Sequence, residues 1–273
     1  MATSYQNDLR LRTAVFTLSL VAWLVMLWPG PAAPAGANNP GYHTVTYCGS
    51  AGAFPVSYAL PGPALPTAAA VPALTWGWAS GWGVMLVAMM LPTLVPPLSH
   101  VYSRSFAQRR AQAIGLFLVG YGTVWLGVGV LLLALQALAQ YAAPNVYLRV
   151  AGAVLLALGW QVSPLKQRCL NRGHRHPALA AFGWRAEWDA LRLGLEHGAW
   201  CAASCWALML LPLLLPYGHV WAMALVGLLM FCERLDPPAQ PAWRWRGFKT
   251  AIGYGRLRLL GARSNSYSLL AQR

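Results

Sequence analysis

Six runs of apolar residues, each close to the ~20 residues that a helix needs to cross the hydrocarbon core of a bilayer, constrain this chain more than any other feature. They cover residues 13–28, 76–98, 113–139, 150–165, 193–215 and 220–232. Because the bilayer core offers the backbone no hydrogen-bond partners, such runs fold as helices whose backbone groups bond to one another. The sequence therefore predicts an all-α, polytopic membrane helix bundle with about six transmembrane helices.

The distribution of basic residues predicts which side of the membrane each segment faces. Only 10% of the residues are charged, where a soluble domain has about 25%. All 20 Lys and Arg residues except Arg149 lie before the first run, after the second, between the fourth and fifth, or after the sixth. The positive-inside rule puts these segments and both termini in the cytoplasm. Topology thus explains the net charge of +14, and no nucleic-acid partner is expected.

This topology divides the chain into three parts. Residues 1–12 are a cytoplasmic N-terminus, residues 13–233 are the membrane domain, and residues 234–273 are a basic cytoplasmic tail. The outer loop at 29–75 is uncharged and rich in Pro, Gly and Ala, so it cannot build much of a core. Residues 1–37 fit either a retained first helix, which we favour, or a cleaved signal peptide.

A stripe of metal-binding residue types lies in the fifth run. His197, Cys201, Cys205 and Met209 occur at every fourth position. Positions i and i+4 lie on nearly the same face of a helix, and imidazole, thiol and thioether groups suit soft or borderline metals. Copper is the expected metal, with zinc second. The alternative is that the cysteines are small apolar residues that pack against a neighbouring helix.

Weaker ligand candidates lie in three other segments. Met89 lies four residues after Met85 in the second run, before three prolines that predict a kink. Cys169 follows Pro164, which is expected to end the fourth helix, so Cys169 is predicted to lie on a cytoplasmic loop. The remaining candidates are His174 and His176 on that loop, and His43 and Cys48 in the outer loop.

Glu196 lies at or just inside the predicted membrane boundary. A carboxylate at that depth is costly unless it is paired or faces a cavity. Its candidate partners are Arg192 one turn before it, Lys166 from the preceding helix, a cation, or a coupled proton. Glu233 closes the sixth run in a similar way.

Four blocks of this sequence resemble a bacterial family. The blocks are Trp82 to Pro92, Gly120-Tyr121 with Trp125, Gln161 through Lys166 to Cys169-Leu170, and His197-Gly198 through Met209 to Glu233. Over roughly residues 75–235 they are similar to an uncharacterised family of predicted metal-binding integral membrane proteins, some of which are labelled copper chaperones. The family has adjacent cysteines where this chain has Ser204-Cys205, and a second cysteine after the one that matches Cys169. The resemblance implies copper handling in a bacterial inner membrane.

The sequence predicts a non-enzymatic protein, since it contains no Ser/His/Asp arrangement, glycine-rich phosphate loop or paired carboxylates. The leading hypothesis is a membrane-embedded protein that binds copper and delivers it to a membrane metalloenzyme. One alternative is an accessory subunit of a membrane oxidoreductase that binds no metal, and another is a small ion transporter that uses Glu196. The expected partners are the bilayer and another membrane protein, either of which would suit the Trp243-Arg244-Trp245-Arg246 segment.

Overall fold

The computed structural model describes most of the chain outside the outer loop. The described residues are 2–27, 70–143, 145–175, 177–180, 182–215 and 218–247, together with positions 250, 252, 253 and 256. His43, Cys48, His176 and the end of the basic tail lie outside them, as does most of the loop predicted at 29–75.

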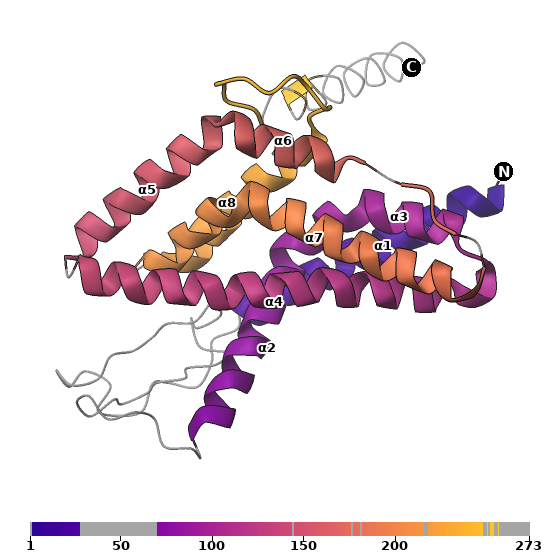
Figure 1. Ribbon diagram of the computed structural model, residues 1–273, viewed down its shortest axis with the longest axis horizontal. Coiled ribbons are helices and arrows are strands. Elements are labelled where there is room, and N and C mark those ends of the chain that lie inside the picture. The colour runs from indigo at the N-terminus through magenta and orange to yellow at the C-terminus, as the bar shows by residue number, and fades with distance from the viewer. Residues whose placement is uncertain are drawn as a thin grey trace, which may run out of the picture.

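The described residues form eight α-helices and two short 3₁₀ turns and contain no strand (Figure 1). In chain order the elements are α1 (Ala2–Leu27), α2 (Ala70–Met90), η1 (Leu91–Leu94), α3 (Val95–Arg104), η2 (Ala107–Arg109), α4 (Arg110–Ala142), α5 (Val146–Val162), α6 (Pro164–Gly173), α7 (Gly183–Leu214) and α8 (His219–Leu235). The prediction of an all-α fold is confirmed for this part of the chain.

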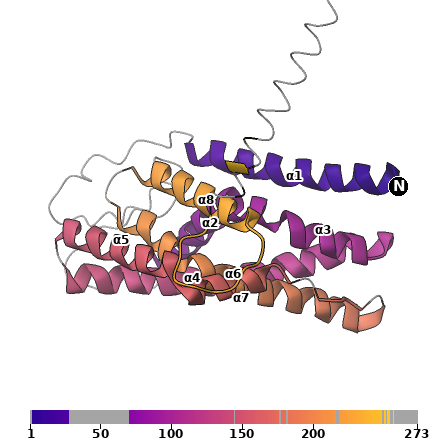
Figure 2. The same ribbon diagram turned by 90° about the horizontal axis from the view of Figure 1, so that it is seen from above.

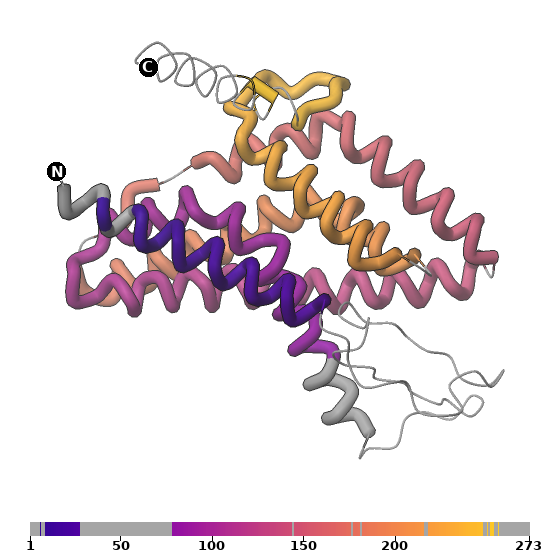
Figure 3. The backbone as a smooth tube through the Cα atoms, turned by 180° about the vertical axis from the view of Figure 1, so that it is seen from behind, coloured from indigo at the N-terminus to yellow at the C-terminus, as the bar shows by residue number. Residues whose placement is uncertain are grey.

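The helices are arranged in layers. Figure 2 shows α1 along one side of the bundle and α4, α5 and α7 along the other, with α8 between them. α1 packs on α2 and α3, as the view from behind shows (Figure 3). The Ser19 hydroxyl and the Trp23 indole nitrogen of α1 both donate to the carbonyl of Ala88 in α2, at 2.7 and 3.1 Å. These bonds fix α1 against the helix that leads into the bundle.

The most extensive helix pair is α4 with α7, and two glycines allow it. A Cβ atom on Gly120 would lie 2.5 Å from the carbonyl oxygen of Leu191, and one on Gly194 would lie 2.1 Å from the carbonyl oxygen of Phe117. No real side chain fits at those distances, so the two backbones meet only because both positions are glycine. Small residues play this role widely at contacts between membrane helices.

Proline breaks the second run where the sequence predicts a kink. α2 ends at Met90, a single 3₁₀ turn over Leu91–Leu94 contains Pro92, and α3 begins at Val95. A proline lacks the backbone N–H of the helical ladder and clashes with the preceding turn, which explains the break. Met90 and Leu94, on either side of Pro92 at this break, are buried.

The loop predicted after Pro164 is wrong, because a second helix begins there. α5 ends at Val162, and the Ser163 hydroxyl caps α6 by accepting from the backbone N–H of Lys166 at 3.1 Å. Pro164 occupies the first helical position, where its missing N–H costs nothing. The helix axis bends by 64° between α5 and α6. Cys169 therefore lies within α6, and His174 lies directly after it.

In the described part of the chain, four segments are long and apolar enough to span a membrane: Leu9–Leu27, Trp78–Arg104, Ala107–Ala142 and Gly183–Leu214. The bent pair of α5 and α6 gives a fifth if it is counted as one span. The sixth predicted span corresponds to α8, which has 17 residues. Large apolar side chains on the outer faces of the helices stay exposed, among them Leu20 at 59% and Leu155 at 70%. These features are compatible with a membrane protein.

Candidate metal-binding site

A small cavity lies where five elements meet. α7 supplies Cys201, Ser204 and Cys205, while α8 supplies Met230, Glu233 and Arg234. Met90 at the end of α2, Thr93 in η1 and Leu170 in α6 complete the lining. The cavity thus contains two thiols and two thioethers, which are soft ligands of the kind that Cu(I) prefers.

The two cysteines are held one turn apart on the inner face of α7. Cys201 and Cys205 are both buried, and the Cys205 thiol donates to the carbonyl of Cys201 across 3.0 Å. The Cys201 sulfur lies 3.4 Å from the hydroxyl of Tyr121 in α4. The Ser204 hydroxyl also donates to the Cys201 carbonyl, at 2.7 Å. The crossing of α4 and α7 and the turn between the cysteines therefore set the position of Cys201.

The methionines at the cavity are not the ones that the sequence pattern favoured. Met90 and Met230 line it, whereas Met89 lines a separate apolar hollow beside Gly227 of α8. Met209 is buried in the core two turns from Cys201, away from the cavity lining. Successive residues of a helix point about 100° apart, so Met89 and Met90 face different neighbours.

His197 and Cys169 also lie away from the cavity lining. His197 is buried, and its ring packs at centroid distances of 6.1 Å from both Phe117 and Tyr121 of α4. Cys169 is half-buried on α6. Of the residues predicted from the sequence, the structure thus brings Cys201, Cys205 and Glu233 to one cavity.

A buried ionic cluster adjoins the cavity. Lys166 of α6 and Glu233 of α8 form an ion pair of 2.8 Å, and their side chains are only 1% and 2% exposed. The Gln161 side chain accepts from the Lys166 ammonium and donates to the Glu233 carboxylate. Every member of this cluster has a polar partner, which a charge in an apolar interior requires. Lys166 therefore pairs with Glu233, not with Glu196.

Glu196 lies on the surface of α7. It forms an ion pair of 2.7 Å with Arg192, one turn before it on the same helix, and the two side chains are 48% and 65% exposed. An exposed carboxylate paired in this way needs neither a bound cation nor a coupled proton to offset burial. This is one of the partners that the sequence suggested.

After α8 the chain folds back over α6. Residues 236–247, here called the return segment, are held by two side chains of α6. Gln167 bonds to the backbone of Ala242 at 2.6 and 3.1 Å and to the carbonyl of Arg244 at 2.8 Å. Asn171 bonds to the backbone of Ala239 at 2.6 and 3.2 Å. Gly247 of this segment packs on the side chain of Glu233, where a Cβ atom would lie 3.1 Å from the carboxylate's Cγ. The return segment thus packs on the ionic cluster at Glu233.

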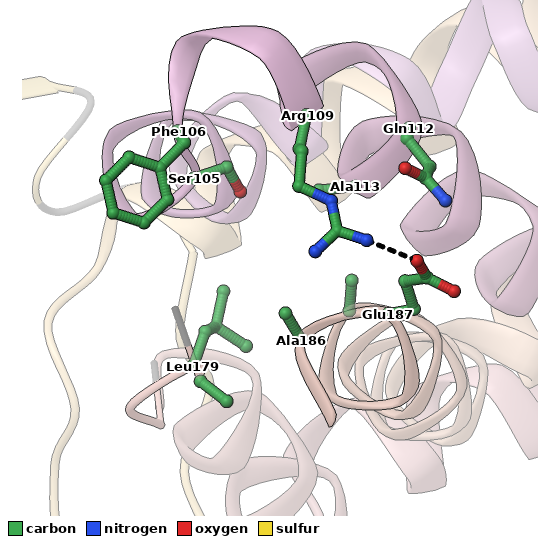
Figure 4. Close-up of a pocket in the computed structure, with 10 residues that line it drawn as sticks. Ser105, Phe106, Arg109, Gln112, Ala113, Leu179, Ala186 and Glu187 are labelled. Atoms are coloured by element: carbon green, nitrogen blue, oxygen red, sulfur yellow. Dashed lines mark hydrogen bonds and ion pairs between the residues drawn. The ribbon is translucent and has the colours of Figure 1, made fainter. Parts of the chain in front are cut away.

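A second pocket lies between the start of α4 and the start of α7 (Figure 4). Its empty volume is about 380 Å³, and its main polar contact is an ion pair of 2.5 Å between Arg109 and Glu187, which are 38% and 40% exposed. None of its lining residues is a cysteine, histidine or methionine. Its chemistry does not suit a soft metal.

The residues at the first cavity differ from the ligand set of a typical zinc site. Among the residues that the structure describes, no group of three or more His, Cys, Asp and Glu side chains is arranged to hold a metal ion. Zinc in proteins is almost always bound by three or four such ligands. The first cavity is lined instead by two cysteines and two methionines, whose sulfur atoms are softer donors.

Residues 79–255, more than half of the chain, match the PpoB2 family, whose description is copper chaperone. The chain belongs to this family. No curated protein and no solved structure matches it. The matched region begins in α2 and continues past α8. It contains all nine residues that line the cavity at Cys201 and Cys205, here called the sulfur cavity.

Sequence reasoning missed Met90, Met230 and Arg234. A signal for two of them is present in α8, because Met230, Glu233 and Arg234 lie at positions i, i+3 and i+4 and so share one helix face. Met90 carries no comparable signal, since its direction depends on where α2 breaks.

Proposed function

We propose that this protein is a membrane-embedded copper carrier that binds Cu(I) at Cys201 and Cys205 and passes it to a membrane metalloenzyme. The observation that carries the proposal is the convergence of two thiols and two thioethers, Cys201, Cys205, Met90 and Met230, on one cavity. Membership of a family described as copper chaperone supports copper as the cargo. The role is one of binding and delivery, without catalysis.

Binding exchanges two thiol protons for the metal ion. Cu⁺ and two thiols give a copper dithiolate with a charge of −1 and two released protons, so affinity rises with pH. The Cys205 thiol must give up the hydrogen bond of 3.0 Å that it donates to the Cys201 carbonyl. Met90 and Met230 are neutral, weaker ligands that hold the ion while an acceptor's thiolates replace those of the carrier.

In this proposal the bundle spans the inner, cytoplasmic membrane six times, with α8 and the bent α5–α6 pair as two of the spans and both termini in the cytoplasm. The asymmetry of the basic residues supports this orientation. The cavity then lies close to the cytoplasmic face, because α6, the return segment and the basic end of α8 all adjoin it. Exposed Trp243 and Trp245 on the return segment are suited to the partner or the bilayer surface.

The test is the copper content of anaerobically purified, reduced protein after loading with Cu(I), measured by mass spectrometry. We expect about one copper per chain in the wild type and none in the Cys201→Ser/Cys205→Ser variant, because both thiolates are needed to hold the ion. Cys169→Ser is the matched control and should keep its copper, since Cys169 is off the cavity lining. Absence of copper from the wild type would sink the proposal and leave an accessory subunit, recognised by loss of co-purification when residues 243–273 are removed.

A further inference from the structure

Two cations and one carboxylate lie at the edge of the sulfur cavity. Lys166 and Glu233 neutralise each other in a buried ion pair of 2.8 Å. Arg234 is the second cation, and no ion pair within the described part of the chain includes it. The protein part of the site therefore carries a net charge of about +1 while both cysteines are protonated.

The Arg234 guanidinium is directed at the cysteine turn. It lines the cavity together with both cysteines, so it is placed to attract the two thiolates that form when a metal ion binds. Its Nη2 atom donates to the Ser204 hydroxyl at 3.5 Å, and that hydroxyl donates in turn to the Cys201 carbonyl. The side chain thus contacts the turn of helix α7 that contains Ser204 and the two cysteines.

Gly173 at the end of α6 provides the space for this guanidinium. A Cβ atom on Gly173 would lie 2.6 Å from the Nη1 atom of Arg234. Any larger residue would push the guanidinium from its place, while the flexible arginine could adjust without disturbing the backbone. The guanidinium thus bonds to the Ser204 hydroxyl and occupies the space that the missing side chain of Gly173 leaves.

The charge of the loaded site depends on the metal. Two thiolates with Cu⁺ sum to −1, and two thiolates with Zn²⁺ sum to zero. In a poorly hydrated interior an uncompensated charge is costly, and an opposite charge nearby removes much of that cost. A cation beside the dithiolate favours the complex of the monovalent ion and gives no comparable gain to the neutral zinc complex.

We propose that Arg234 is the counter-ion of the copper dithiolate and the residue by which this site selects Cu⁺ over Zn²⁺. This inference rests on the proposed binding of Cu(I) by Cys201 and Cys205. In this proposal Arg234 supplies the charge that balances the copper dithiolate, whereas the thioethers of Met90 and Met230 supply soft donor atoms and no charge.

The experiment compares two metals in three purified proteins in detergent: wild type, Arg234→Gln and Arg234→Lys. Dissociation constants are measured by competition with a chromogenic chelator for Cu(I), anaerobically, and with a second chelator for Zn(II). We expect Arg234→Gln to weaken Cu(I) binding about 10- to 100-fold and to change Zn(II) binding less than about 3-fold. Arg234→Lys keeps the charge and should recover most of the copper-to-zinc ratio. Arg192→Gln, an exposed arginine on α7, is the control and should change neither metal.

A second variant tests the same idea with every charge retained. Gly173→Ala displaces the guanidinium and should weaken Cu(I) binding about 3- to 10-fold with little change for Zn(II). Gly159→Ala is its matched control, because a Cβ atom there meets nothing within 4 Å. This pair decides the question if Arg234→Gln does not fold.

The outcomes separate the two proposals. If the wild type binds Cu(I) and both Arg234→Gln and Gly173→Ala leave the copper-to-zinc ratio within about 2-fold, Arg234 is not the selecting residue, and the copper carrier stands. An equal loss of both metals in Arg234→Gln also overturns the inference, since it indicates a purely structural role. If the wild type binds no Cu(I), the proposed function fails and this inference fails with it.

Discussion

Two of the pockets in the described part of the chain lie at or beside the same kind of ion pair, in opposite settings. At the pocket between the starts of α4 and α7, Arg109 and Glu187 meet at 2.5 Å while more than a third of each side chain stays exposed. Beside the sulfur cavity, Lys166 and Glu233 meet at 2.8 Å with almost no exposure. The first pair needs no explanation beyond its location near water. The second pair keeps two charges in an apolar interior at a desolvation cost of several kcal/mol per ion.

The difference indicates where the chain maintains polar groups for a reason other than stability. A buried ion pair is often no more stabilising than apolar residues of the same size. Its presence next to two thiols and Arg234 therefore points to the electrostatic requirements of that cavity. The exposed pair, in a pocket without sulfur, has no such neighbour.

The largest effect is expected where one partner of the buried pair is removed. Lys166→Met leaves Glu233 charged and unpaired in the interior, which should lower the free energy of unfolding by about 3–5 kcal/mol. Arg109→Met at the exposed pair should cost no more than about 1 kcal/mol. Unfolding of the two variants in detergent, followed by circular dichroism, measures both. Equal losses would remove the distinction between the two regions.

The double variant Lys166→Met/Glu233→Leu sharpens the same comparison. Because both charges are gone, most of the stability lost in Lys166→Met should return, at least about 2 kcal/mol. Copper affinity should not return with it if the cluster serves the site. A double variant that stays as unstable as the single one would show that the cluster stabilises the fold through the packing of its side chains and not through their charges.

A smaller effect is expected from the thioethers. Met90→Leu and Met230→Leu keep the apolar volume and remove one sulfur each, so each should weaken Cu(I) binding about 3- to 10-fold, close to 1 kcal/mol, with little loss of stability. Met89→Leu and Met209→Leu are matched controls from the same helices or the same core, and neither lines the cavity. Chelator competition for Cu(I) gives the affinities. Equal losses at Met89 and Met90 would contradict the placement of the ligands.

The smallest effect is expected at the exposed pocket. Glu187→Gln breaks the ion pair with Arg109 and should leave the Cu(I) dissociation constant within about 2-fold of the wild type. Its effect on unfolding should disappear at 1 M salt, where the Debye length is about 3 Å. A marked change in copper binding would mean that the two ends of α7 are coupled.

The fold could be predicted from the sequence where the residues of one helix face, or a single proline, determine the local structure. The apolar runs predict the helices, the prolines around Pro92 predict the break after α2, and the four-residue spacing of Cys201 and Cys205 predicts that they share a face. The sequence analysis did not predict that a new helix, α6, begins at Pro164, because a proline can both end one helix and occupy the first turn of the next. The cap that decides between them is the single hydroxyl of Ser163.

The partners of the cysteines were not predictable from spacing within one helix. Periodicity shows which residues share a face, but it does not show which neighbouring helix that face meets. Met90 reaches the cavity because η1 turns the end of α2, and Met230 reaches it because α8 packs against both α7 and α2. For the same reason Lys166 finds Glu233, which is 67 residues away in the chain.

The glycine contact between α4 and α7 has a consequence for anyone who wishes to transplant this site. Gly120 and Gly194 each lie against the opposite backbone, and no larger side chain fits at either position, so the two helices make their close contact at these two residues. This contact lies two turns from Cys201 on the same helix, so it helps to fix the position of Cys201 relative to α4. Copying only Cys-x-x-x-Cys into another bundle would reproduce the two cysteines, whereas copying the glycine contact as well would also reproduce their position relative to the neighbouring helix.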